Sequence, residues 1–154
     1  MFFFGWTSLE IIQLLAEAGA DLNAANDEGE WALYLAAWEG NVEAVVYLLS
    51  VGAKANVIDP HTGSALHMAV IADNMEIARL LIEAGVDVNA VDGDRWTCLW
   101  WLKSPEMALF LLSWGADPSM SAWGSLPEDL ESHSSAVKDI LRAHRVKNSE
   151  EPLE

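Results

Sequence analysis

The sequence predicts an all-α solenoid of four to five stacked helix-turn-helix units with hairpin-like finger loops. Three observations predict it: a 33-residue period, helical spacing of apolar residues within each period, and a glycine after each long helix. The period is carried by Gly19, Gly52 and Gly85, by Leu33, Leu66 and Leu99, by Asn23, Asn56 and Asn89, and by Glu10, Glu43 and Glu76. Glu106 and Gly115 follow Glu76 and Gly85 after 30 residues instead of 33, so the fourth unit is three residues shorter.

Each unit is expected to pair a short apolar helix with a longer amphipathic one. The short helices are predicted from Ala32 to Trp38 and from Ala65 to Ile71. In the second unit Val42, Val45 and Leu49 recur at helical spacing, which places them on one apolar face. No unit covers its own apolar face, so neighbouring units must stack.

The predicted boundaries follow from this period. We expect one domain over residues 1–147, with units at about 1–25, 26–58, 59–91, 92–120 and 121–147, and a disordered tail over 148–154. A final helix is predicted from Ser135 to Arg145, with cations toward its carboxyl end, where the helix dipole favours them. Phe2–Phe4 are interpreted as part of a degenerate amino-terminal cap; the alternative is that the chain starts inside a longer array.

Two segments of the third unit carry a family resemblance. Gly63-Ser64-Ala65-Leu66-His67-Met68-Ala69, followed by the stretch from Leu80 to Ala90, resembles an ankyrin repeat, and residues 8 to about 144 follow the same pattern. The resemblance implies stacked helix pairs whose finger loops and short helices line a concave, protein-binding groove. Tyr34 and Trp100 stand where His67 stands, so we expect the hydrogen bonds that open those helices to differ.

The composition is strongly acidic and restricts the choice of partners. The 154 residues include 24 acidic and 8 basic ones, for a net charge of -16, and residues 138–154 are neutral, so the repeats carry the whole excess. Such a surface repels nucleic-acid phosphates and anionic membranes. The first basic residue is Lys54, which argues against a secretion signal, and no apolar run is long enough to span a membrane, so we expect a cytoplasmic protein.

Motifs for catalysis and for cofactor binding are absent from the sequence. Cys98 is the single cysteine, which excludes an internal disulfide and a cysteine-built zinc site. None of the four histidines pairs with another ligand at metal-binding spacing, and no phosphate-binding or nucleophile motif occurs. We therefore expect neither an enzyme nor a cofactor.

Acidic and tryptophan residues fall together on the positions that the resemblance places along the groove. We call these nine residues the candidate face: Asp27, Glu28, Glu30, Trp38, Glu39, Asp92, Asp94, Trp96 and Trp123. Four other tryptophans are expected to fill space between repeats: Trp31, Trp100, Trp101 and Trp114. Carboxylates beside exposed indoles suit a partner rich in Arg and Lys.

Two hypotheses for the function follow. The first is a non-catalytic interaction module, monomeric in isolation, that binds a basic protein, in its sharpest form as an inhibitor or immunity-type protein of a cationic enzyme or toxin. The alternative is a scaffold or adaptor subunit that binds through apolar end residues such as Phe3 and Phe4, with acidity serving only solubility.

Overall fold

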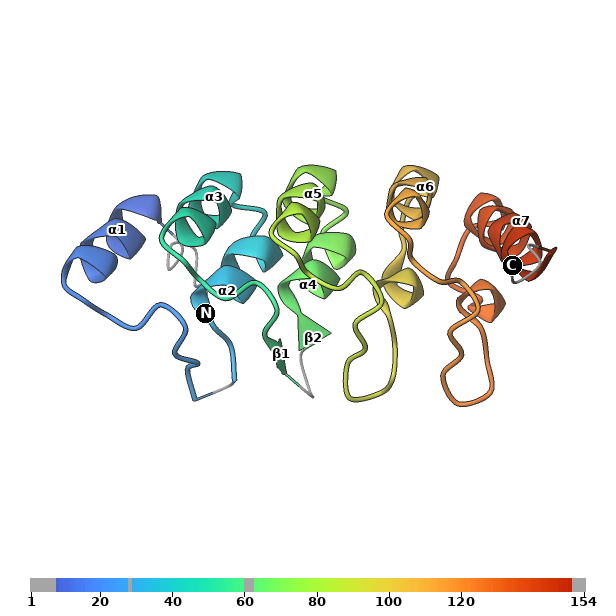
Figure 1. Cartoon of the computed structure of the whole chain (residues 1–154), viewed down its shortest axis with the longest axis horizontal. Helices are drawn as coiled ribbons and strands as arrows, with labels where there is room; N and C mark the ends of the chain where they lie inside the picture. The colour runs from blue at the N-terminus through green and yellow to red at the C-terminus, as the bar shows by residue number, and fades with distance from the viewer. Residues whose placement is uncertain (1–7, 28, 60–62, 151–154) are drawn as a thin grey trace.

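The computed structural model describes residues 8–27, 29–59 and 63–150, with the side chains of 148–150 left aside. In this part of the chain the helices form two rows (Figure 1). The outer row holds α1 (Leu9–Glu17), α3 (Val42–Ser50), α5 (Met75–Glu83), α6 (Pro105–Ser113) and α7 (Ser135–Glu150). The inner row holds α2 (Ala32–Trp38), α4 (Ala65–Ile71) and two 3-10 helices, η1 (Cys98–Trp101) and η2 (Pro127–Asp129). The predicted all-α solenoid is confirmed.

The finger loops precede the inner helices and project on one side of the stack (Figure 1). One finger forms a small antiparallel hairpin of β1 (Ile58–Asp59) and β2 (Gly63–Ser64), in which Ile58 pairs with Ser64. Single bridges close two other fingers, between Ala25 and Trp31 and between Ala122 and Ser125. These pairings close the described parts of three fingers directly before α2, α4 and η2 begin.

Three successive outer helices, α3, α5 and α6, begin at side-chain caps in equivalent positions of the repeat. Asn41 Oδ1 accepts a hydrogen bond from the Ala44 amide, and Asn74 Oδ1 accepts one from the Ile77 amide, each at 3.0 Å. Ser104 Oγ does the same for the Met107 amide at 3.2 Å. These side chains satisfy amides that have no partner within the helix.

Two of the asparagines that recur at the period, Asn23 and Asn89, join one unit to the next. Asn23 Oδ1 accepts a hydrogen bond from the Lys54 amide at 2.7 Å. Asn89 Oδ1 accepts one from the Asp117 amide at 2.8 Å, and its Nδ2 donates to the Gly115 carbonyl at 3.0 Å. The side chain thus substitutes for backbone pairing between successive loops.

The core runs between the two rows and repeats with the same period. Leu33, Leu66 and Leu99 on successive inner helices are completely buried. Each buried leucine stabilises the fold by about 1.5–3 kcal/mol relative to an exposed one. Ala36 and Ala69 are also fully buried, and their small side chains let α2 and α4 approach closely.

The shortened fourth unit departs from the expected pair of α-helices. Its inner helix is the four-residue 3-10 helix η1, and that of the fifth unit is the three-residue η2. The missing three residues leave too little chain between the finger and the Ser104 cap for a two-turn α-helix. A 3-10 helix rises about 2 Å per residue, so it spans this distance with fewer residues.

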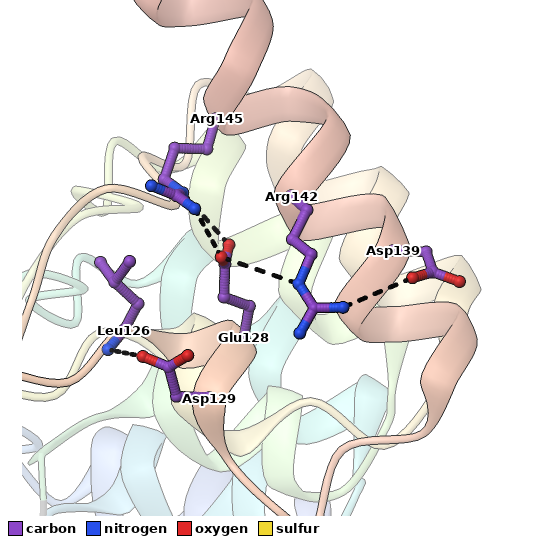
Figure 2. Close-up of polar contacts among 6 residues, drawn as sticks. All are labelled: Leu126, Glu128, Asp129, Asp139, Arg142 and Arg145. Carbon is purple, nitrogen blue, oxygen red and sulfur yellow. Dashed lines mark hydrogen bonds and ion pairs between the residues drawn. The ribbon is translucent and has the colours of Figure 1, made fainter.

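The last helix is longer than predicted. It starts at Ser135 as expected but continues through Glu150, so residues 148–150 of the predicted tail are helical. Residues 151–154 lie outside the described part of the chain. The helix packs beside η2, where a buried carboxylate on Glu128 faces Arg145 and Arg142 (Figure 2).

Candidate partner-binding face

The finger between Ala25 and Trp31 carries the first acidic group of the candidate face. Its ends are joined because the Asn26 amide donates to the Glu30 carbonyl at 2.8 Å and the Glu30 amide donates to Asn26 Oδ1 at 2.9 Å. Asn26 Nδ2 also donates to Glu30 Oε2 at 3.0 Å, so the Glu30 carboxylate is turned onto its own loop. Asp27 is exposed at the tip, whereas Glu28 lies outside the described residues.

The finger from Asp92 to Trp96, two units further along the chain, closes in the same way. The Asp92 amide donates to the Trp96 carbonyl at 3.1 Å, and Asp92 Oδ1 accepts hydrogen bonds from the amides of Trp96 and Asp94, both at 2.9 Å. The Asp92 carboxylate thus shapes the finger, while Asp94 is exposed. Arg95 is exposed beside it, a cation on the finger that sequence reasoning missed.

Three indoles form a cluster directly after this finger. Trp96 stacks on Trp100 with ring centroids 5.7 Å apart and planes 9° apart, and it meets Trp101 edge-on at 5.1 Å. Trp100 is buried, while Trp96 and Trp101 are half-buried. Trp96 was expected to be exposed and Trp101 to be buried, and mutual stacking leaves both at the boundary of the core. We call Trp96, Trp100 and Trp101 the indole cluster.

The other tryptophans in the described part of the chain divide between core and surface. Trp31 is buried between repeats, as predicted, and Trp38 and Trp123 are 54% and 78% exposed, as predicted. Trp114 is 43% exposed, so its expected burial is wrong. It is the C-cap residue of α6 in the outer row, where its ring contacts Phe110 of the same helix at 6.3 Å.

The candidate residues are spread over the finger tips and the far end of an inner helix. Asp27, Asp94 and Trp123 belong to three different fingers, whereas Trp38 ends α2 and Glu39 follows it as the C-cap. Trp38 is the seventh residue of α2, so it lies about 10 Å along the helix axis from the finger that ends at Trp31. Two hollows of about 390 and 400 Å³ lie elsewhere, and none of the candidate residues lines either. The candidate residues thus form an open surface, which suits a large partner more than a small ligand.

The start of α4 shows a reciprocal pair of hydrogen bonds that α2 and η1 lack. Ser64 Oγ accepts from the His67 amide at 3.4 Å, while the Ser64 amide donates to His67 Nδ1 at 3.2 Å, so the two residues cap the helix reciprocally. Trp31 and Thr97, which stand at the position of Ser64, make no side-chain cap. Burial lowers the pKa of His67, which favours the neutral ring that this geometry needs.

The repeated caps, asparagine links and finger geometry agree with the comparison with known families. Residues 3–49 match a family profile described as ankyrin repeats (many copies), and residues 51–122 match one described as ankyrin repeats (3 copies). The chain belongs to the ankyrin repeat family. A search of curated proteins finds no match. Ankyrin repeats indicate a protein–protein interaction module, and proteins of this kind are generally non-catalytic.

Among the described residues no helix is both long and apolar enough to cross a bilayer. Over the same part of the chain, histidine, cysteine and acidic side chains form no group of three suited to a metal ion.

Proposed function

We propose that this ankyrin repeat protein binds a basic protein through its finger side. The observation that carries the proposal is the exposure of Trp38 and Trp123 in a chain of net charge -16. Large exposed indoles contribute nothing to a solenoid core, and interface hot spots are enriched in tryptophan. Carboxylates at finger tips, here Asp27 and Asp94, attract cationic groups and speed association.

The backbone at Trp123 supports its role as an anchor. Trp123 has a φ of 54° and Gly124 a φ of 81°, so both residues of the two-residue turn between Ala122 and Ser125 are left-handed. Asn-Gly is the preferred pair for such a turn, and a bulky residue is strained there. Tryptophan at this position stabilises neither the turn nor the core. We therefore infer that Trp123 is present because it binds a partner.

The distribution of cations agrees with an acidic binding surface. Arg145 and Arg142 lie against Glu128 at the end of the stack, and Arg79 lies over the Phe110 ring at 5.9 Å in the outer row. Three cations depart from this arrangement: Arg95 lies on the finger that carries Asp94, and Lys54 and Lys103 are exposed on loops. We expect the partner to place its own acidic or polar group opposite Arg95.

The finer role that we propose is inhibition of a cationic enzyme or toxin, as an immunity-type protein of the cytoplasm. A rigid row of fingers can hold carboxylates where the enzyme's own site expects phosphates. An acidic blocker of this kind acts as a monomer and needs no cofactor.

The test compares two matched pairs of substitutions in the full chain. Asp27→Asn with Asp94→Asn removes two finger charges, and Glu76→Gln with Glu83→Gln removes two exposed charges from α5 in the outer row. Immobilised variants are offered an extract of the source organism, and retained proteins are identified and titrated at several salt concentrations. We expect basic proteins to be retained by wild type and by the α5 pair but not by the finger pair. Equal retention by both pairs, or affinity independent of salt, contradicts the proposal.

One observation favours the scaffold hypothesis as a second candidate. Three apolar side chains of α1 are exposed at the first end of the stack: Ile11, Leu14 and Leu15. Phe3 and Phe4, which the hypothesis names, lie outside the described residues. Sedimentation of wild type and of Leu14→Glu tests it, since a concentration-dependent assembly lost in the variant supports a scaffold.

A further inference from the structure

Two buried histidines from different units hold the backbone that presents the indole cluster. His67 Nε2 on α4 lies 3.2 Å from the Trp96 carbonyl oxygen. His133 Nε2, between η2 and α7, lies 3.3 Å from the Trp100 carbonyl oxygen. The two contacts therefore fall at either end of the stacked pair Trp96 and Trp100, one from the unit before and one from the unit after.

The contacts of His67 define the proton on its ring. Nδ1 accepts the Ser64 amide at 3.2 Å and has Ser64 Oγ at 2.8 Å, so Nδ1 is the unprotonated nitrogen. Nε2 consequently carries the proton and donates it to the Trp96 carbonyl. A second proton on Nδ1 faces the Ser64 amide, and two donors then oppose each other.

His133 also donates from Nε2, because its partner is a carbonyl oxygen that can only accept. Its ring is buried between the fifth unit and the indole cluster. Burial lowers the pKa of both histidines. For His133 the backbone carbonyls of Trp100 and Pro127 oppose this shift, and the nearby Lys138 adds to it, but burial has the largest effect. A charged ring is thus disfavoured at both places while the segment stays closed.

We propose that His67 and His133 form an acid-releasable clamp on residues 96–101, so that mild acid loosens the indole cluster while the rest of the stack stays folded. Opening exposes both rings to water, where they take up protons freely. Since the indole cluster adjoins Asp94, the opening changes the candidate face whichever protein binds there.

The charged groups around each ring do not reverse the effect of burial. Asp92 on the neighbouring finger favours a charged His67, but less than burial disfavours it. The other ionisable groups on elements packed against α4 are either exposed, as Glu76, Arg79 and Glu83 are, or buried and neutral, as Tyr34 and Cys98 are. Around His133 the carboxylate of Glu128 is paired with Arg145, and Asp129 accepts the Leu126 amide.

The sign of the pH effect follows from linkage. The closed form binds fewer protons than the open form below about pH 6.5, the ordinary histidine pKa, so closure weakens as pH falls through this value. The opening equilibrium increases about tenfold per pH unit for each histidine released. Carboxylates titrate near pH 4, so the interval from pH 6.5 to 5.0 isolates the histidines.

The experiment measures amide hydrogen-exchange protection factors of the whole chain between pH 7.5 and 5.0. The reporting amides are Trp96, bound to Asp92 Oδ1, and Trp100, bound to the Thr97 carbonyl. We expect their protection to fall about tenfold or more per pH unit below 6.5, while the amides of Val45 and Ala78 in α3 and α5 keep theirs. Protection that is independent of pH, or that falls equally in all helices, overturns the clamp.

Variants separate the two rings from general acid effects. His133→Gln keeps an amide donor for the Trp100 carbonyl but has no titrating ring. The fall in the protection factor of the Trp100 amide should therefore be smaller than in wild type, by about a factor of ten for each pH unit. His144→Gln is the matched control, since His144 on α7 meets only the Ile140 carbonyl of its own helix among the contacts described. An unchanged slope in His133→Gln, or the same loss of slope in His144→Gln, overturns the proposal. If His133→Gln does not fold, the pH dependence of the protection factors in the wild-type chain tests the proposal.

Discussion

Arg145 near the end of the chain donates two hydrogen bonds to the buried carboxylate of Glu128. Arg145 Nη2 lies 2.7 Å from Oε1 and Nε lies 3.3 Å from Oε2, a two-point contact that locks α7 onto η2 (Figure 2). Arg142 Nε approaches the same carboxylate at 3.9 Å and also pairs with Asp139. The terminal unit, whose inner helix has only three residues, is thus held by charge as well as by apolar packing.

Removing Arg145 should destabilise the fifth unit strongly. Arg145→Ala leaves a buried carboxylate with only the more distant Arg142, and we expect a loss of about 2–4 kcal/mol in the free energy of unfolding. Urea unfolding followed by circular dichroism measures it. Arg142→Ala is the control, because its side chain is half exposed and its loss should be below about 1 kcal/mol. Equal losses of stability in the two variants would show that the contact between Arg145 and Glu128 contributes no more than the one between Arg142 and Glu128.

Arg95→Gly should stabilise the protein. Arg95 has a φ of 64°, at the finger position where Gly29 and Gly124 have φ values of 81°. Relief of left-handed strain contributes roughly 1–3 kcal/mol and the extra chain entropy of glycine costs roughly 0.4–1 kcal/mol, so a net gain of about 1 kcal/mol is expected. Thermal unfolding of Arg95→Gly and Arg95→Ala separates strain from charge, since alanine removes the charge but keeps the strain. A gain in both variants would assign the effect to charge.

Trp123→Asn should preserve folding and weaken binding. Asparagine tolerates the left-handed turn better than tryptophan, so stability should be unchanged or higher by about 0.5 kcal/mol. Loss of an anchoring indole should lower the affinity for the partner by about 30-fold or more. The partner is the protein recovered in the experiment on the finger charges. Trp114→Asn is the control, because it also removes an exposed tryptophan but from the outer row. Calorimetric titration of the partner with each variant measures the two affinities. Undiminished affinity in Trp123→Asn would remove Trp123 from the face.

Cys98 should resist thiol reagents until the protein unfolds. The side chain is completely buried in η1, and burial raises the pKa of its thiol far above the ordinary value. Because the thiolate is the reactive form, labelling in native conditions should be at least about 100-fold slower than in urea. Since Cys98 is the single cysteine, the stoichiometry of labelling is one per chain. Fast native labelling would mean that η1 opens readily at neutral pH.

Local patterns were predicted well because they depend on neighbouring residues. The bounds of α2 and α4 agree with the sequence prediction, as does the start of α7 at Ser135. The solenoid itself follows from the 33-residue period, since a unit with an uncovered apolar face must stack on its neighbour. The exposure of Trp38 and Trp123 was also predicted, from their positions in the repeat.

Contacts that join distant residues, or that compete for one group, could not be predicted from the sequence. The carboxylates of Asp92 and Glu30 accept hydrogen bonds within their own fingers, which the sequence pattern did not indicate, and their contact with a partner stays a prediction. The cations of the last helix were explained by its dipole, whereas Arg145 binds a glutamate 17 residues earlier. A sequence pattern lists donors and acceptors but leaves open which pairs form.

The order of repeats, the helix positions and the acidic character were determined by the sequence alone, because each depends on composition or on spacing along the chain. Only the tertiary structure decided which indoles stack, which carboxylates remain exposed and which buried histidine meets which carbonyl. The physical reason is that exposure and hydrogen bonding depend on side chains contributed by adjacent units. Those side chains meet only after the stack has formed.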